Sequence, residues 1–219
     1  MGIGTLRMWA REDNYSGYKE LIKDELFPRI LSMCRNDGKV MPGDVADLMT
    51  IMYRDQFICI NEKPEIWYRF SKMHHRWIKT EPVVIRREIS TKVYSEFKDV
   101  HQYYIGRSND SESEDHKKAT NVFKGMNKLK TPAFKSNIVK ELMEPFYDTN
   151  NEFFDTLNEK RHLLGMENGT YDLLTDTFRA GRPDDRITYS TKCRYPNMMD
   201  PTTEENVGKK IAKINEFIS

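Results

Sequence analysis

Two pairs of adjacent residues are the ones most able to do chemistry in this chain: the carboxylates Asp184-Asp185 and the imidazoles His74-His75. Metal-assisted phosphoryl chemistry needs carboxylates that converge on ions a few ångström apart, commonly from an Asp-x-Asp arrangement, and the sequence contains none. Neighbouring side chains on a strand point to opposite faces, so neither pair can easily hold one ion together. We therefore predict no metal site, and we predict that Asp184-Asp185 caps a turn.

A phosphate-binding loop for a nucleotide is also missing. Such a loop ends in Gly-Lys-Ser/Thr after an upstream glycine, because backbone amides cradle the phosphates and the hydroxyl holds magnesium. The pair Gly208-Lys209 is followed by Lys210 and lacks the upstream glycine. No Ser/His/Asp or Cys/His arrangement has the spacing of a nucleophile and its base. We therefore predict no catalytic residue and no cofactor for this chain.

One segment combines basic with aromatic side chains. From Arg69 to Lys92 there are seven basic residues against Glu81 and Glu88, interleaved with Trp67, Tyr68, Phe70 and Trp77. Cations attract phosphates and rings stack on bases, a combination that favours single-stranded nucleic acid. Alternatively, the aromatic residues form the core of a small sheet and the cations its solvated face. The candidate nucleic-acid contacts in this segment are Arg69, Lys72, His75, Arg76, Lys79, Arg86 and Arg87.

A second basic segment runs from Lys117 to Lys140 and contains seven lysines and no acid. Its apolar residues, such as Val122 and Met126, can pack inward and leave the lysines facing solvent. Lysine neutralises phosphate without reading sequence, which suits non-specific contact with DNA. A merely solvated helix face fits the pattern equally well. The candidate contacts are Lys117, Lys118, Lys124 and Lys128, followed by the remaining lysines of the segment.

The elements that must position these side chains are helices and short strands, so we predict an α+β fold, mainly helical, with two small antiparallel hairpins or meanders. A helix is expected from Thr5 to Cys34, with a break or kink at Pro28, and a second from the capping residue Asp44. Three short strands are expected within 57–78. After Pro82, apolar residues at spacings of four, four, four, three and four predict an amphipathic helix that stops near Gly106: Ile85, Ile89, Val93, Phe97, Val100 and Tyr104.

The second half begins with a polar segment and ends in a meander. Residues 107–116 contain no apolar side chain and are predicted to be a flexible linker. Two helices, Lys117 to Lys130 and Ala133 to Phe146, should follow. From His162 to Tyr195, turn residues between apolar pairs predict a short meander, and we assign structural turn roles to Asn168, Gly169, Asp172 and Asp184. The expected parts are residues 1–40, 41–106, 107–116, 117–201 and, as the start of a further helix, 202–219.

Composition bounds the class of protein. The 219 residues are 32% charged and 38% hydrophobic with a net charge of +1, so attraction to nucleic acid must come from local clusters. Cys34, Cys59 and Cys193 are far apart and odd in number, which argues against a disulfide framework or a zinc knuckle. We expect a reducing compartment. No apolar run has the length of a membrane span or the place of a secretory signal, so neither secretion nor a membrane is expected.

Three parts of the chain resemble one family of replication proteins. The segment His162 to Tyr195 resembles a signature of the primase-helicases of large DNA viruses and of satellite phages and plasmids, with a leucine-rich lead, Asn-Gly-x-x-Asp-Leu, a Phe and Gly-Arg-Pro-Asp-Asp. The run Leu6 to Ala10, followed by Asp13-Asn14, is similar to the short helical module after the primase domain in that family. Trp-Tyr-x-Phe at 67–70 and His-Arg-Trp at 75–77 resemble its aromatic hairpin.

The resemblance implies a connecting and collar segment between a primase and a superfamily 3 AAA+ helicase, which assembles as a hexameric ring in DNA replication. The chain alone would be non-catalytic, because it ends where the motor would begin; the parent protein would be an ATP-dependent helicase-primase, and ATP and magnesium would belong to its motor. Implied partners are single-stranded or forked DNA, the helicase and primase domains of the same protein, and further copies of the chain. Replication would proceed in the cytoplasm, a viral factory or the nucleus.

Two other functions are open on the residues alone. A protein-interaction module could set subunit register without binding DNA, with its basic faces meeting acidic surfaces of a neighbouring subunit. A metal-dependent nuclease could use Asp172, Asp176, Asp184 and Asp185. The spacing of these aspartates suits hairpin turns, however, and no second carboxylate cluster accompanies them, so the nuclease is disfavoured.

Overall fold

A computed structural model describes residues 15–196, with side chains from Glu25 onward. Helices and two small antiparallel sheets confirm the α+β prediction. The chain divides into two compact units. Within the described range, the first unit contains the residues up to Arg69 together with Lys79–Phe154, and the second contains Phe70–Ile78 and the residues from Asp155 onward. The N-terminal motif at Leu6 to Ala10 and the helix expected at 202–219 lie outside the described residues.

The first unit begins with two helices, α2 (Tyr15–Cys34) and α3 (Pro42–Tyr53). The break expected at Pro28 is wrong, because α2 continues through it. Asp44 does not cap α3 as predicted; Met41 is the N-cap, Pro42 takes the first position, and the Asp44 carboxylate accepts a hydrogen bond of 3.2 Å from the Met41 backbone N–H. Asp44 therefore satisfies the backbone from the third helical position.

The three strands predicted between residues 57 and 78 are confirmed as β1 (Phe57–Glu62), β2 (Glu65–Ser71) and β3 (Arg76–Thr80). They form one sheet in the order β1-β2-β3. β1 and β2 pair antiparallel with Cys59 opposite Trp67, and the register shifts between Cys59 and Asn61. Phe57, Cys59 and Trp67 are buried, so alternate residues of the hairpin face the core.

The predicted amphipathic helix is present but contains a wider turn. α4 (Pro82–Glu88) leads without interruption through a π-helical turn, η1 (Ile89–Val93), into α5 (Tyr94–Arg107). In a regular α-helix, residues four apart drift by about 40° per step, because each residue turns about 100°. The apolar positions from Ile85 to Phe97 are each four apart, and all of them are buried. The π turn absorbs this drift and keeps them on one face.

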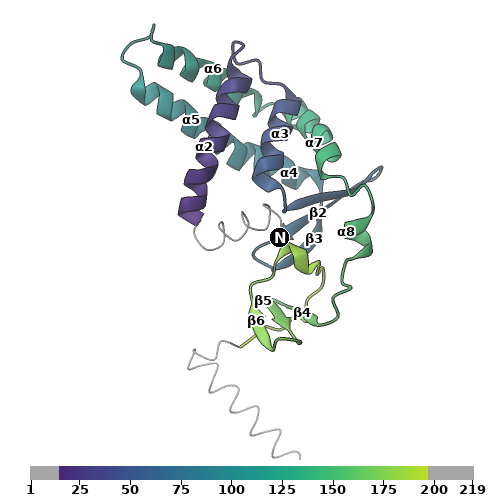
Figure 1. Cartoon of the computed structure of the whole chain (residues 1–219). Helices are drawn as coiled ribbons and strands as arrows, with labels where there is room; N and C mark the ends of the chain where they lie inside the picture. The colour runs from purple at the N-terminus through teal and green to yellow at the C-terminus, as the bar shows by residue number, and fades with distance from the viewer. Residues whose placement is uncertain (1–14, 197–219) are drawn as a thin grey trace, which may run out of the picture. The chain divides into compact units, whose positions relative to one another are not determined.

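Two further helices confirm the prediction for the middle of the chain, α6 (Glu114–Lys128) and α7 (Pro132–Phe146). The segment predicted as a linker at 107–116 instead connects α5 to α6 within the first unit, and these two helices lie side by side (Figure 1). Ser113 begins α6 by accepting a hydrogen bond of 3.1 Å from the His116 N–H, so part of this polar segment is ordered as a helix cap.

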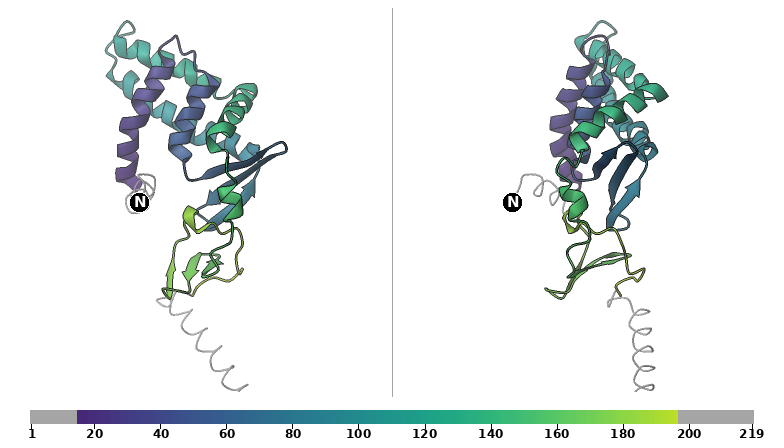
Figure 2. Two further views of the ribbon diagram at one scale, coloured as in Figure 1. Left: turned by 45° about the vertical axis from the view of Figure 1, so that its right-hand side comes forward. Right: turned by 90° about the vertical axis from the view of Figure 1, so that its right-hand side faces the viewer.

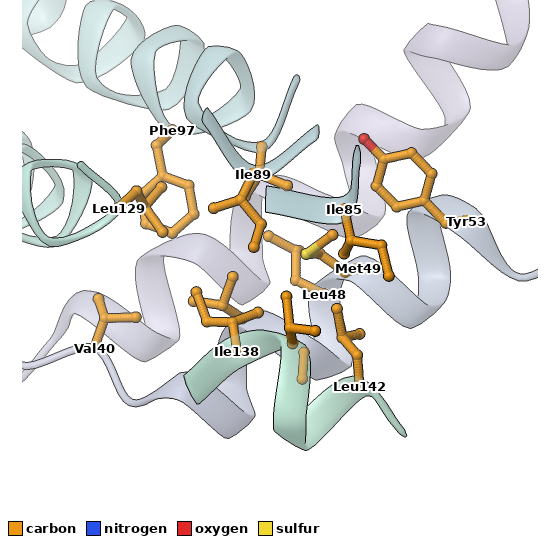
Figure 3. Close-up of a cluster of buried hydrophobic side chains, with 14 of the residues drawn as sticks. Val40, Leu48, Met49, Tyr53, Ile85, Ile89, Phe97, Leu129, Ile138 and Leu142 are labelled. Carbon is orange, nitrogen blue, oxygen red and sulfur yellow. The ribbon is translucent and has the colours of Figure 1, made fainter. Parts of the chain in front are cut away.

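The core of the first unit lies between α3, the α4–η1–α5 helix and α7. Figure 3 shows Leu48 and Met49 of α3, Ile89 of η1 and Ile138 and Leu142 of α7 directed toward one another, and each is at most 1% exposed. α3 and α7 lie side by side in Figures 1 and 2. The short helix α8 (Glu152–Asp155) follows. Burial of this apolar surface fixes the face that the α4–η1–α5 helix turns toward α7.

The second unit contains the predicted meander, with β4 (Leu163–Met166), β5 (Gly169–Asp172) and β6 (Thr177–Arg179) in that order. Its turns lie at the predicted positions, between Met166 and Gly169 and between Asp172 and Thr177. A 3₁₀ turn, η2 (Pro183–Asp185), follows. The indole N–H of Trp77 donates a hydrogen bond of 2.8 Å to the Pro183 carbonyl, so the 70–78 hairpin packs on the meander segment.

Candidate nucleic-acid interface

The aromatic residues of the first basic segment are not surface platforms. Trp67, Phe70 and Trp77 are at most 5% exposed, and Phe70 packs edge-on against Trp77 with ring centres 5.8 Å apart. Tyr68 is half-buried against Phe153. For Trp67, Phe70 and Trp77 the prediction of stacking on bases is therefore wrong. The alternative prediction, that these aromatic residues form a core, is confirmed. Alternation alone could not have predicted this, because Trp67 and Phe70 are three residues apart on β2 and face opposite sides of the sheet.

The cations of the same strands are divided between the two units and differ in surroundings. Arg69 lies 3.9 Å from Glu88, a carboxylate that also pairs with Lys92. Lys72 and Lys79 are exposed. One guanidinium nitrogen of Arg76 is buried without a hydrogen-bond partner in the described part of the chain, which suits a structural position more than a phosphate contact.

His75 is held in a structural contact. Its backbone has φ 53°, in the left-handed region, and its Nδ1 accepts a hydrogen bond of 3.3 Å from the Gly181 N–H. Burial lowers the pKa of His75, and the neighbouring His74 lowers it further. A methyl group at Gly181 would lie 2.3 Å from the His75 carbonyl oxygen, so the two backbones are in close contact. His75 is thus neutral and engaged, and its predicted contact with nucleic acid stays a prediction.

Each predicted lysine of α6 has a local partner. Lys117 lies 3.9 Å from Glu114 and Lys118 3.3 Å from Asp115, one turn earlier on the same helix. Lys124 pairs with Asp37, and Lys128 donates to the Val40 carbonyl at 3.4 Å. The acidic partners Glu114, Asp115 and Asp37 lie outside residues 117–140 in the sequence, so counting charges within that segment did not reveal them. Such exposed pairs are weak, so these lysines stay candidates for contact with nucleic acid. Their local partners reduce the attraction that they exert on a phosphate.

The remaining basic residues gather along one groove. Arg86 and Arg87 of α4 and Lys130, Lys135 and Lys140 of the α6–α7 region line three adjoining hollows of about 300, 350 and 440 Å³. Val83 and Arg86 are shared by the first two hollows, and Ser90 and Lys135 by the last two. We call this surface the basic groove. Sequence reasoning selected both arginines but ranked these three lysines behind those of α6.

The sequence explains why these side chains line a common groove. Arg86, Ser90 and Tyr94 are four residues apart and lie one position after the buried strip Ile85, Ile89 and Val93. The π turn that keeps the buried strip on one face also aligns the next strip beside it. On α7, Lys135 and Lys140 flank the buried residues Ile138 and Val139, so both walls rise directly from the core.

The basic groove carries charge that the described residues do not neutralise. None of its five cations forms an ion pair with a carboxylate between Glu25 and Pro196. Lys135 donates to the Ser90 hydroxyl at 3.0 Å, and the Lys130 ammonium lies 5.1 Å from the centre of the Tyr94 ring. Carboxylates line only the first hollow, through Glu65 and Glu81. The groove therefore attracts anions, most strongly in its second and third hollows.

The meander residues act in the fold, as predicted for its turns. The Asn168 side chain forms two hydrogen bonds with the Tyr195 backbone, at 2.8 and 3.0 Å. A methyl group at Gly169 would lie 2.5 Å from the Arg179 carbonyl oxygen. Asp172 accepts a hydrogen bond of 3.0 Å from the Leu174 N–H, which closes the β5–β6 turn.

The sequence predicted a turn role for Asp184 and a cap for the pair Asp184-Asp185, and in the structure the capping side chain is that of Asp185. The Asp184 side chain is exposed, and only its carbonyl contributes, by accepting from the Lys160 ammonium at 2.6 Å. Asp185 is 4% exposed, accepts two hydrogen bonds from the Arg179 guanidinium at 2.7 and 2.8 Å, and accepts a third from the Arg182 N–H. The signal was its position, third in a turn that begins at a proline.

Two observations concern the grouping of metal-binding residues and the state of the buried thiols in the described part of the chain. Between Glu25 and Pro196 no three His, Cys, Asp or Glu residues are grouped so that they could hold a metal ion. Burial raises the pKa of the Cys34 thiol to about 12 and that of Cys59 to about 11, so both thiols stay protonated at neutral pH. In the same part of the chain, every helix is too short or too polar to cross a membrane.

Comparison with known proteins agrees with the resemblance found in the sequence. The family model described as "D5 N terminal like" matches residues 46–217. Three relatives carry the name "Putative helicase". One, from Acanthamoeba polyphaga mimivirus, is 29% identical over 97% of this chain and 22% of its own length. Another, from Invertebrate iridescent virus 3, is 25% identical over 93% of this chain and 24% of its own length.

The third relative, from Frog virus 3, is 23% identical over 66% of this chain and 18% of its own length. The chain thus spans about a fifth to a quarter of the length of these relatives. The family model covers well over half of the chain, including the 67–77 hairpin and the 162–195 meander that carried the resemblance. The chain therefore belongs to the D5 N terminal like family.

Proposed function

We propose that this chain is a non-catalytic segment of a viral primase-helicase and that it supports replication by holding DNA. The observation that supports the proposal most is the basic groove, whose five cations have no carboxylate partner among the described residues. The three relatives named as helicases supply the context. Locally paired cations, such as Lys118 with Asp115, offer phosphate a weaker field.

The mechanism would be electrostatic. Phosphates that enter the groove replace counterions, and the release of those counterions drives binding with a strong dependence on salt. Contacts of this kind position a strand without reading its sequence. The chain would guide DNA toward the motor of the whole protein, where ATP and magnesium would act, and a ring of copies would surround the strand. Forked DNA at a replication site would be the natural ligand of that assembly.

A salt-titrated fluorescence anisotropy assay tests DNA contact. The chain is titrated into a labelled single-stranded oligonucleotide at increasing salt concentrations, and the logarithm of the binding constant is plotted against that of the salt concentration. We expect binding at low salt and a steep linear decline. Absence of any binding at the lowest salt concentration would defeat the proposal.

One observation favours a second function, contact between subunits. Leu173 and Leu174 are 53% and 76% exposed on the β5–β6 turn, which the Asp172 side chain and a 2.7 Å contact between the Thr175 and Thr177 hydroxyls hold in place. Two leucines on an ordered turn suit a protein interface. Light scattering after size exclusion tests this idea: Leu173→Ser with Leu174→Ser should reduce the mass of any oligomer that the chain forms.

A further inference from the structure

We infer that the basic groove is a track for one nucleic-acid strand, held through its phosphates alone, and that the track runs from Lys130 to the two arginines of α4 and ends at Glu65 and Glu81. The inference rests on the proposed function and adds the kind of ligand, the contacts and the limit of the site.

The distribution of charge sets the ends of the track. The second hollow is lined by Arg86, Arg87 and Lys135, and the third by Lys130 and Lys135, without a carboxylate in either. In the first hollow, Lys140 and Arg86 stand beside Glu65 and Glu81. Like charges repel, so a phosphate gains little there. The attractive part of the groove therefore stops at Arg86, although the hollow itself continues.

The wall of the track is long enough for a few phosphates. Arg86 and Tyr94 are eight residues apart on the α4–η1–α5 helix, which corresponds to about 12 Å at a rise of about 1.5 Å per residue. One strand of a helical nucleic acid advances about 3.4 Å per phosphate, so about three phosphates span this wall. Four cations line the same stretch, which is a sufficient number to neutralise them.

The second and third hollows of the groove have no free surface for stacking or reading a base. Tyr94 is the aromatic residue in their lining; its ring lies beneath the Lys130 ammonium and is half-buried. The Ser90 hydroxyl donates to the Arg86 carbonyl at 2.9 Å and accepts from Lys135. The second and third hollows therefore offer neither a stacking platform nor a spare hydroxyl, and the track should bind mixed-sequence single-stranded DNA and RNA with similar affinity.

One strand fits this recess better than a duplex. The cations lie in hollows between two helices, and a flexible single strand can bend its backbone into them. A DNA duplex is stiff over about 150 base pairs and presents its phosphates on a convex surface, so it would meet fewer of these side chains at once. We therefore expect single-stranded oligonucleotides to bind more tightly than a duplex of the same sequence.

The test compares substitutions along the groove in the salt-titrated anisotropy assay. Lys130→Ala with Lys135→Ala should reduce the slope of the log–log plot by about 1.4, since each phosphate contact contributes about 0.7 for a single strand. Lys140→Ala should change the slope far less, and Glu65→Gln with Glu81→Gln should raise affinity.

Lys39→Glu with Lys98→Glu is the control, because both lysines are exposed outside the groove. Far-ultraviolet circular dichroism verifies folding, and Arg87→Ala replaces any variant that unfolds.

The outcomes separate the two proposals. A chain that binds no oligonucleotide overturns the proposed function. Binding that survives the Lys130 and Lys135 substitutions, but is lost in Lys117→Glu with Lys118→Glu, overturns the track while leaving DNA contact in place on α6. Equal losses from Lys140→Ala and from the paired track variant overturn the limit at Glu65 and Glu81. A duplex that binds as tightly as the single strand overturns the single-strand assignment.

Discussion

The Lys135 ammonium donates a hydrogen bond of 3.0 Å to the Ser90 hydroxyl and so joins α7 to the π turn, although the two residues are 45 positions apart in sequence. Both residues line the second and third hollows. The bond brings a cation to the middle of the groove without neutralising it, because a hydroxyl carries no charge. The same contact that steadies the two walls therefore keeps the groove positive.

Replacing Ser90 with Ala should weaken the join between the walls. We expect the free energy of unfolding to fall by about 0.5–1 kcal/mol, since the bond is exposed and neutral on one side. Thr91→Val is the matched control, because within residues 25–196 the Thr91 hydroxyl donates to the Arg87 carbonyl, as the Ser90 hydroxyl does to Arg86, and has no further partner of the kind that Lys135 is to Ser90. Urea unfolding measures both variants. Equal losses would mean that the bond to Lys135 contributes nothing to stability.

Gly125 should resist replacement, although Ala favours a helix. A methyl group there would lie 2.7 Å from the Val40 side chain and 2.9 Å from the Cys34 sulfur, where α6 packs closely on its neighbours. Overpacking costs about 1–3 kcal/mol, whereas the change from Gly to Ala in a helix gains at most about 1 kcal/mol. Gly125→Ala should therefore lower the unfolding midpoint.

Gly106 supplies the control for that substitution. It lies in the last turn of α5, and a methyl group there would meet no atom within 4 Å. Gly106→Ala should leave the unfolding midpoint unchanged or raise it slightly. A stabilised Gly125→Ala variant would contradict the close packing of α6 against Val40 and Cys34.

Acidification should destabilise the second unit through His75. The pKa of this imidazole is lowered in the folded protein, first by burial and then by His74, so the unfolded chain binds more protons below its usual value of 6.5. Stability from neutral His75 is therefore present above about pH 6.5 and is lost as pH falls toward the lower folded pKa. Protonation would also end the hydrogen bond from Gly181. Thermal unfolding measured at a series of pH values tests this.

His75→Asn isolates the titration. Asn tolerates the left-handed backbone at this position, and its carbonyl oxygen can accept a hydrogen bond without taking up a proton. The unfolding midpoint of the variant should fall less between about pH 7 and pH 5 than that of the natural chain. An identical pH dependence would assign the effect to other groups.

The strands, helices and meander turns could be predicted because their signals are local. The β-branched and aromatic residues on either side of Lys63-Pro64 indicated β1 and β2, and Asn168-Gly169 located a turn that the structure confirms. The π turn was not predicted, because repeated spacings of four were interpreted as a regular helix. The spacing of four was itself a signal for the π turn, because residues four apart drift by about 40° per step around a regular α-helix.

The groove could not be predicted, because it depends on which residues meet in space. Arg87 and Lys135 are 48 positions apart, and only packing of α4 against α7 brings them to one hollow. Pairing of the α6 lysines was equally hidden, since Asp37 reaches Lys124 from the turn after α2. Charge counted along a window therefore could not separate the locally paired lysines of α6 from the groove lysines Lys130, Lys135 and Lys140.

The adjacent aspartates of η2 should respond very differently to loss of charge. Asp185→Asn removes the negative charge of a carboxylate that is 4% exposed and accepts hydrogen bonds from the Arg179 guanidinium and the Arg182 N–H, and loss of such bonds at a buried group costs about 1–3 kcal/mol. Asp184→Asn changes an exposed side chain and should cost less than about 0.5 kcal/mol. Unfolding in urea compares the two. Because both variants lose one negative charge at neighbouring positions, a difference between them reports the contacts of Asp185 with the Arg179 guanidinium and the Arg182 N–H, and equal stabilities would show that these contacts do not hold the segment after β6.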